Sequence, residues 1–240
     1  MQYCLPAVGL ALLSVWARRI RLLYRTGFRA ASRRLYFLTA LCLGAVTCTA
    51  MLAQELILAR CGQLSWRTGL PLHLCSCMGV LTLPMLLTGN RHLTHLSLYL
   101  GLPGAAAALL FPAVAPTPWP QLTALAFHTM HTGVLLAPLL PLLTGWRPAP
   151  EGVWEAGGFL VLLALVALGV NALTGGNYLF LQSPAASGPL GLLAGHGVTA
   201  YRLLLTLLAA AVLVLEQALV RLLLRRAAPL PAPGLAPWRL

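Results

Sequence analysis

The sequence predicts an all-α, polytopic membrane protein with about seven transmembrane helices, its N-terminus outside and its C-terminus inside. Two observations predict this class. Hydrophobic residues make up 59% of the 240 residues and charged residues only 8%, against roughly 45–50% and about 25% in soluble domains. The apolar residues also fall into long runs that Pro, Gly and Arg separate. An ordinary soluble enzyme is therefore excluded.

Each predicted helix corresponds to one apolar run, and a spanning helix needs about 20 mainly apolar residues. We expect helices over residues 4–17, 35–58, 70–88, 94–113, 121–143, 153–174 and 197–222. The first run is short and is expected to be a short or partly tilted helix. Residues 1–226 then form one transmembrane helical domain, and the Pro-rich residues 227–240 are expected to be a disordered cytoplasmic tail.

The Arg residues predict the orientation, because short cytoplasmic loops are enriched in them. The net charge is +12, and all 16 basic residues are Arg. If successive helices alternate in direction, thirteen of the 16 Arg residues lie on the inner side: Arg18, Arg19, Arg21, Arg25, Arg29, Arg33, Arg34, Arg91, Arg147, Arg221, Arg225, Arg226 and Arg239. Arg60, Arg67 and Arg202 lie outside or near the outer surface. Topology anchoring explains the basic charge, so we expect no nucleic-acid partner.

Polar side chains inside a membrane cost free energy, so polar clusters within the apolar runs are candidate functional sites. Three clusters qualify. They cover residues 70–77, residues 127–133, and residues 174–181 followed by His196 and Arg202.

The first two clusters contain residue types that bind metals well. On a helix, His73 and Cys77 share a face whereas Cys75 points about 200° away from each. His128 and His131 lie about 60° apart. A tetrahedral site would need that pair together with either His73 and Cys77 or Cys75 alone, and no carboxylate is near enough to support it. We expect no metal and no other cofactor. The alternative to a metal site is nucleophilic catalysis: a thiol and an imidazole on neighbouring helices are the minimum for a Cys/His acyl-transfer site.

Four stretches resemble the YwaF-like bacterial membrane proteins and their animal relatives, the transmembrane protein 164 group. These are Leu-Pro-Leu-His-Leu-Cys-Ser at residues 70–76, Leu-Thr-Gly at 87–89, His131 with Leu-Leu-Ala-Pro at 135–138, and Gly-Asn-Tyr-Leu-Phe-Leu at 176–181. Their order and spacing match the family from roughly the second to the seventh helix. The resemblance implies a multi-helix integral membrane acyltransferase that exchanges acyl chains among phospholipids through a Cys thioester.

Carried over residue by residue, the resemblance implies roles for three residues. Cys75 matches the family's cysteine and would be the nucleophile, and His131 matches its intramembrane histidine and would be the general base. His73, in the same motif as Cys75, would orient or tune the pair. Cys77 and His128 do not belong to the family's pattern. We therefore expect lipid acyl transfer in the outer half of the bilayer, with a phospholipid acyl donor and a lysophospholipid acceptor as partners.

The third polar cluster offers substrate contacts. Acyl transfer needs oxyanion donors, and Asn177 and Tyr178 supply them only if the outer loop folds back over the site; otherwise they fix the backbone of that loop. Arg202 either holds a lipid phosphate by a bidentate contact or anchors the last helix at the interface. We expect the protein to lie in the bacterial cytoplasmic membrane.

Two other functions stay open. A transporter or channel would use the intramembrane residues Glu55 and Glu216 as proton or ion sites, although the sequence has no Asp and no internal repeat. A lipid hydrolase would use the same Cys/His pair with water as the acceptor. His92 and His95, near Arg91, are interpreted as interfacial residues.

Overall fold

The structure, a computed structural model, describes residues 4–184, 189–193, 195 and 197–226, and every regular element in those ranges is a helix. The α-helices are α1 (Cys4–Arg25), α2 (Arg29–Arg60), α3 (Leu74–Thr88), α4 (Arg91–Leu96), α5 (Leu102–Leu110), α6 (Pro120–Leu136), α7 (Leu139–Thr144), α8 (Gly152–Thr174) and α9 (Val198–Arg226). The other helices are η1 (Ser97–Gly101, a π-helix) and the 3-10 helices η2 (Tyr178–Phe180) and η3 (Pro189–Leu193). The predicted all-α class is confirmed; the tail at 227–240 lies outside the described residues.

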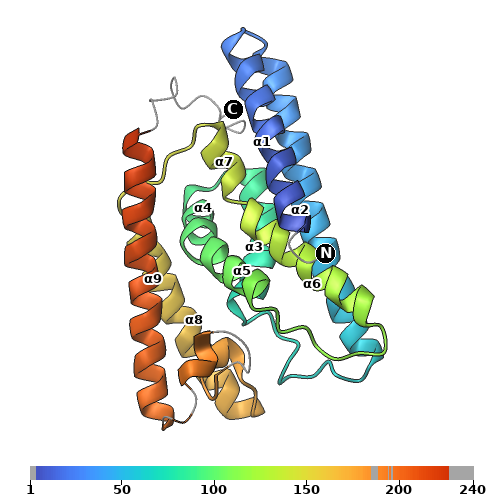
Figure 1. Ribbon diagram of the computed structural model, residues 1–240, viewed down its shortest axis with the longest axis vertical. Helices are drawn as coiled ribbons and strands as arrows, with labels where there is room; N and C mark the ends of the chain where they lie inside the picture. The colour runs from blue at the N-terminus through green and yellow to red at the C-terminus, as the bar shows by residue number, and fades with distance from the viewer. Residues whose placement is uncertain (1–3, 185–188, 194, 196, 227–240) are drawn as a thin grey trace.

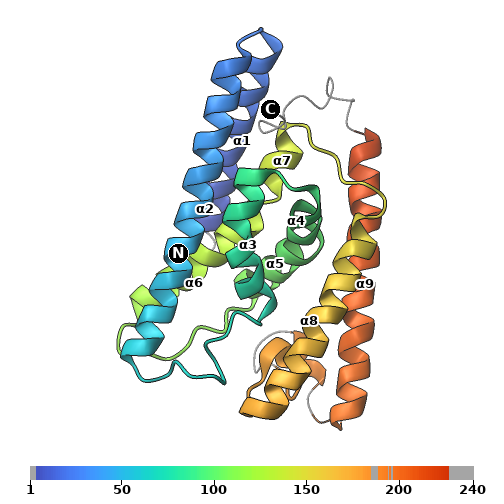
Figure 2. The same cartoon turned by 180° about the vertical axis from the view of Figure 1, so that it is seen from behind.

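The long helices run roughly along the longest axis of the molecule (Figures 1 and 2). α1 and α2 form an antiparallel pair on one flank, and α8 and α9 form a pair on the other flank. The shorter helices lie between the two pairs. α6 packs against α2, α3 and α5, so the expected fifth run, which carries His131, occupies the centre of the fold.

Five helical stretches of the described chain are long and apolar enough to cross a membrane. They are α2, the continuous helix Arg91–Leu110, the kinked helix Pro120–Thr144, α8, and α9 to Leu224. α3 is apolar but shorter. Both α8 and α9 expose mostly Leu and Val, as surfaces that face lipid require. The multi-pass membrane character is confirmed, whereas the number of crossings and their orientation stay predictions.

The segment expected as a loop after the first run is mostly helical. α1 continues to Arg25 and α2 begins at Arg29, so the Arg-rich residues 18–34 extend two helices past their apolar parts. Arg is a good helix former, and the turn between the helices needs only Gly27 in a positive-φ conformation of +88°. The prediction of a loop was wrong because charge marks the end of an apolar run and not the end of a helix.

Proline interrupts two of the predicted helices. Pro103 has no N–H to donate to the carbonyl of Tyr99, and the N–H of Leu102 bonds instead to the carbonyl of Ser97, five residues back. This register makes η1 a π-helix. Pro138 likewise separates α6 from α7.

Glycine allows the central helices to approach closely. A Cβ added to Gly133 of α6 would lie 2.8 Å from the Cβ of Thr47 in α2. Thr47 is held in place because its hydroxyl donates to the carbonyl of Leu43 at 2.7 Å. A Cβ on Gly79 of α3 would lie 3.8 Å from the Sδ of Met130 in α6. Lipid tails are as apolar as Leu, so membrane helices associate largely by such close packing.

Gly133→Ala is expected to destabilise the fold by about 1–3 kcal/mol, because the new methyl group overlaps Thr47. The measurement is the free energy of unfolding in micelles. Gly158→Ala in α8 is the control, since a Cβ there meets no atom within 4 Å. Equal stabilities of the two variants would contradict the packing that we describe.

The alternation of helix direction predicts that Thr26 and Ala113 lie on opposite sides of the membrane. Both residues are exposed, Thr26 in the α1–α2 turn and Ala113 between α5 and α6. Each is changed to Cys in a variant that lacks the native cysteines, and a membrane-impermeant maleimide is added to intact vesicles. We expect labelling of one site only, and labelling of the other after the vesicles are opened. Labelling of both from one side would mean that the number of crossings between them is even.

Candidate functional site

The Cys75 motif forms the beginning of α3. His73 is the residue before the helix, with extended backbone at φ −72° and ψ 143° and no side-chain capping bond. The helix therefore begins at Leu74 and not at residue 70 as expected, because Pro71 disfavours helical geometry at the residue before it. Cys75 is thus the second residue of α3.

The first turn of α3 presents unpaired backbone donors. The N–H groups of Leu74, Cys75 and Ser76 have no acceptor in the described chain, and the first bonded N–H is that of Cys77, which donates to the carbonyl of His73 at 2.9 Å. Unpaired N–H groups and the helix dipole together favour negative charge at such a terminus. The thiol of Cys75 is attached to the turn that offers these donors.

A glycine of α5 lies close to the thiol. Cys75 is partly buried, and a Cβ added to Gly104 of α5 would lie 3.4 Å from its Sγ. The same Cβ would lie 3.3 Å from a methyl group of Leu74. The side of the thiol that faces α5 is therefore covered by backbone alone at Gly104.

The loop after α8 folds back over the start of α3. The ring of His73 packs against the rings of Tyr178 and Phe180, with a centroid distance of 5.3 Å to each. The hydroxyl of Tyr178 accepts from the N–H of Leu70 at 3.0 Å and donates to the carbonyl of Trp66 at 2.9 Å. His73 is therefore positioned by aromatic contacts from a segment more than a hundred residues later in the chain.

Tyr178 itself is fully buried and is held at its backbone by Asn171 of α8. The N–H of Tyr178 donates to the Asn171 side-chain oxygen at 2.7 Å, and its carbonyl accepts from the side-chain nitrogen at 3.0 Å. Leu179 and Phe180, which follow, have positive φ values of 54° and 57°. Non-glycine residues rarely adopt this conformation, so the loop is held in its shape by its contacts.

Asn177 and Arg202 serve the same loop. The side-chain oxygen of Asn177 accepts from the N–H groups of Gln182 and Ser183, and its nitrogen donates to the carbonyl and hydroxyl of Ser183. Arg202 donates through Nε to the carbonyl of Leu181 and through Nη2 to the side-chain oxygen of Gln182, each at 2.9 Å. Two roles were expected for Asn177 and Tyr178, oxyanion donors or residues that fix the loop. Their contacts are those of residues that fix the loop. His196, expected in this cluster, lies outside the described residues.

His131 is buried in α6 and its ring orientation is fixed. Its Nδ1 lies 2.8 Å from the carbonyl of Phe127, and its ring lies 4.1 Å from the Phe127 ring. A carbonyl only accepts, so Nδ1 carries the proton and Nε2 presents its lone pair. In the described chain this Nε2 has no hydrogen-bond partner. The tautomer is therefore the one that a general base requires.

α3 and α6, which carry Cys75 and His131, pack against each other. Met78, Met130 and Val134 lie in one core cluster between them. Among the hydrogen bonds of the described residues, none joins the Cys75 thiol to His131. The two helices are neighbours, as expected. Within the described residues, no direct hydrogen bond joins the thiol to the imidazole.

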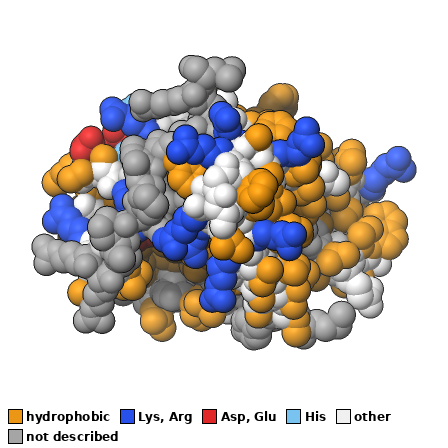
Figure 3. All heavy atoms as spheres, turned by 90° about the horizontal axis from the view of Figure 1, so that it is seen from above, with side chains coloured by type: hydrophobic (Ala, Val, Ile, Leu, Met, Phe, Trp, Pro, Cys, Tyr) orange, Lys and Arg blue, Asp and Glu red, His pale blue; other side chains and the backbone are white. Residues whose placement is uncertain are grey.

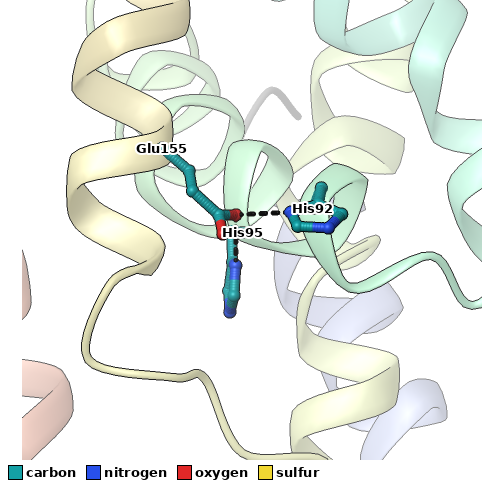
Figure 4. A group of neighbouring side chains, drawn as sticks. All are labelled: His92, His95 and Glu155. Carbon is teal, nitrogen blue, oxygen red and sulfur yellow. Dashed lines mark hydrogen bonds and ion pairs between the residues drawn. The ribbon is translucent and has the colours of Figure 1, made fainter.

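The Cys and His residues weighed as metal ligands do not gather at one point. Within the described ranges, the only group of three ligand atoms lying within 4.8 Å of one another consists of His92, His95 and Glu155. Nδ1 of His92 and Nδ1 of His95 lie 2.9 Å and 2.8 Å from the same oxygen, Oε2 of Glu155 (Figure 4). His95 is 1% exposed. This cluster joins α4 to α8. The sequence interpretation of the two histidines as interfacial residues did not include their contact with Glu155.

Further contacts fix the protons of this cluster. The N–H of Ala149 donates to Nε2 of His95 at 3.1 Å, and Nε of Arg91 donates to Nε2 of His92 at 3.4 Å. Both rings therefore carry their protons on Nδ1 and donate them to the Glu155 carboxylate. A metal ion would need both Nδ1 lone pairs, which would place the Nε2 proton of His95 against the N–H of Ala149. The geometry fits a hydrogen-bonded carboxylate better than a metal centre.

The two acids weighed for transport lie far apart in the fold. Glu55 belongs to α2 and Glu216 to α9, and these helices lie on opposite flanks of the molecule (Figures 1 and 2). Each has a buried carboxylate oxygen without a partner in the described chain. They do not line one common path.

Comparison with known proteins gives one match. The family model described as TMEM164 family matches residues 2–216 of the chain. The matched range includes α1 to α8, the loop that covers His73, and most of α9. No curated protein and no solved structure matches the chain.

Glu155→Ala is expected to destabilise the protein by about 1–3 kcal/mol, because the buried Nδ1–H of His95 loses its acceptor. Thermal unfolding in detergent measures the change. The control is Glu151→Ala, which removes the same charge from an exposed residue that makes no side-chain capping bond at the start of α8. If both variants unfold alike, the cluster does not stabilise the α4–α8 contact.

Proposed function

This chain belongs to the TMEM164 family, and from that premise we propose that it is an integral membrane acyltransferase that remodels phospholipid acyl chains through a thioester on Cys75. The observation that carries the proposal is the position of Cys75 in the first turn of α3. There the thiol stands beside three unpaired N–H groups and the backbone at Gly104. These are the components of a nucleophile with an adjacent oxyanion site.

In the proposed reaction Nε2 of His131 takes the proton of the Cys75 thiol through a water molecule, and the resulting thiolate attacks the ester carbonyl of a phospholipid. The oxygen that becomes negative is stabilised by the N–H groups of Leu74, Cys75 and Ser76. The ester bond then breaks, and His131 gives the thiol proton to the departing lysophospholipid oxygen. An acceptor lysophospholipid attacks the thioester, loses its hydroxyl proton to His131, and leaves with the acyl chain. Cys75 is thereby restored.

Three features of the chain support these roles. The carbonyl of Phe127 holds His131 in the tautomer whose Nε2 accepts a proton. Tyr178 and Phe180 hold His73 at the start of α3, where it acts as a positioning residue. The oxyanion donors of the proposal are backbone groups of α3, since Asn177 and Tyr178 are engaged in the loop.

The proposal requires a water molecule to stand between the thiol and His131 in the first proton transfer, because the two make no direct bond. Catalytic hydrogen bonds often form only when the substrate is bound. The setting that we propose is the bacterial cytoplasmic membrane, with phospholipids as donors and lysophospholipids as acceptors. A hydrolase would share the first step and differ only in using water for the second.

Cys75→Ser is expected to abolish or severely reduce acyl transfer, because a hydroxyl is a far weaker nucleophile than a thiolate at neutral pH. His131→Ala is expected to slow transfer by a factor of about 10² or more. Both are measured in reconstituted bilayers with a labelled acyl donor and a lysophospholipid. The unmodified protein is expected to carry a hydroxylamine-sensitive acyl group on Cys75.

Cys77→Ala is the matched control, two residues further along α3. It leaves the first turn and the thiol of Cys75 in place, so we expect nearly full activity. Full transfer by Cys75→Ala would refute the nucleophile assignment. Release of free fatty acid without transfer, lost in the same variants, would support hydrolysis in place of acyl exchange.

A further inference from the structure

The most basic part of the molecule is the end of the α1–α2 hairpin. Seven Arg lie between residues 18 and 34, and the first acidic residue of the chain is Glu55. Figure 3 looks down on this end, where blue Arg side chains stand among hydrophobic ones. The hydroxyl of Ser32 donates to the carbonyl of Ile20 at 2.9 Å, which fixes the two helices side by side.

An open groove of about 700 Å³ runs between these two helices. We call it the arginine groove, and its larger side chains are Trp16, Arg19 and Leu23 from α1 and Arg34, Leu35 and Leu38 from α2. Because the helices are antiparallel, Trp16 and Leu38 lie on the apolar side of the two Arg residues. The two cations therefore lie in the middle of the groove, with Leu23 on the side of the hairpin turn and an apolar stretch on the side of the membrane-spanning part of the pair.

The cations of the groove are free to bind a ligand. Arg19 and Arg34 are exposed, and within the described chain neither makes a hydrogen bond or an ion pair. Arg202 and Arg91, by contrast, donate to groups of the protein. Two guanidinium groups above an apolar surface match the chemistry of a phosphate attached to an acyl chain.

We propose that the arginine groove binds an anionic phospholipid. Arg19 and Arg34 hold its phosphate, and Trp16, Leu35 and Leu38 contact its acyl chain. An anionic headgroup is favoured over a zwitterionic one, because the seven Arg, none of which forms an ion pair within the described ranges, repel the ammonium group of a zwitterion. The lipid is favoured over a soluble anion because all lining residues except Arg19 and Arg34 are apolar, and because the groove opens beside a membrane helix.

This site is separate from the Cys75 site and does not depend on the proposed acyl transfer. The start of α3 lies toward the opposite end of the molecule from the α1–α2 turn (Figures 1 and 2). A lipid in the groove is therefore a bound partner and not a substrate. Loss of acyl-transfer activity in any Cys75 variant would leave this proposal unchanged.

Trp16 in the groove supplies the measurement. Lipids with brominated acyl chains quench Trp fluorescence on contact, and the difference between the unmodified protein and Trp16→Phe isolates the signal of Trp16. The protein is placed in phosphatidylcholine bilayers that contain a minor fraction of brominated phosphatidylglycerol or brominated phosphatidylcholine. We expect the anionic lipid to quench Trp16 more strongly, and this preference to fall on the order of tenfold in the double variant Arg19→Gln/Arg34→Gln.

The control is Arg18→Gln/Arg33→Gln, which removes the same charge from exposed neighbours outside the groove. It is expected to keep most of the preference, as is Arg19→Lys/Arg34→Lys, which keeps the charge. An equal loss in the control would show diffuse attraction to the surface and overturn the site. Equal quenching by the two lipids in the unmodified protein would also overturn it.

Two further measurements keep the proposal testable if the Gln variant fails to fold. In the unmodified protein, the preference is expected to weaken as salt concentration rises, and a preference independent of salt would contradict the role of Arg19 and Arg34. Added glycerol 3-phosphate is expected to have no effect. Its removal of the preference would mean that the groove binds a soluble phosphate and not a lipid.

Discussion

The buried side chain of Tyr178 is the contact on which the candidate site depends. It is held at its backbone by Asn171 of α8, and its hydroxyl holds the segment before α3 at Leu70 and Trp66. α3 has no side-chain cap, so these bonds determine where its first turn lies. The same ring supports His73. One residue thus links the α8 end of the fold to the turn that carries the candidate nucleophile.

Close helix packing explains why this turn stands where it does. In lipid, apolar side chains gain little by contact with each other, and helices associate where small residues allow their backbones to approach. Gly133 and Gly79 bring α2, α3 and α6 together, and Gly104 lets α5 approach Cys75. The feature that stabilises the bundle also leaves the thiol without a covering side chain on that side. Close packing at Gly104 therefore brings the backbone of α5 against Cys75.

The helices were predictable from the sequence because a membrane allows few alternatives: every backbone group in hydrocarbon must be bonded within the segment. The ends of the helices were less predictable. Residues 18–34 are mostly helical although they carry seven Arg, because helix ends in water are set by propensity and turns and not by polarity. The π-helix at Ser97–Gly101 has a local cause in Pro103, but the choice between a kink and a π-turn depends on neighbouring helices.

The sequence named the candidate residues of the site, but not the contacts that surround them. Polarity within apolar runs marked Cys75 and His131 only as two of several candidates, and the resemblance to the YwaF-like and transmembrane protein 164 proteins selected them. The roles of Asn177 and Arg202 depend on contacts within a loop whose shape no local pattern specifies. Glu155 contacts His95 across 60 positions of sequence, so the cluster needed the fold to be recognised. One signal was present: Glu155 is one of only four acids in the chain.

Unpaired polar groups distinguish the candidate functions. A ligand supplies the partner that an unpaired polar atom lacks, so the place where several such atoms stand together is where we propose that the substrate binds. The unpaired oxygens of Glu55 and Glu216 lie on opposite flanks, so the two carboxyl groups do not meet. The unpaired N–H groups of α3, in contrast, stand in one turn with Cys75, on a helix that packs against the helix of His131. Donors, the proposed nucleophile and the proposed base thus lie on two adjacent helices, the arrangement that our acyl-transfer proposal requires and that two separate carboxyl groups do not offer.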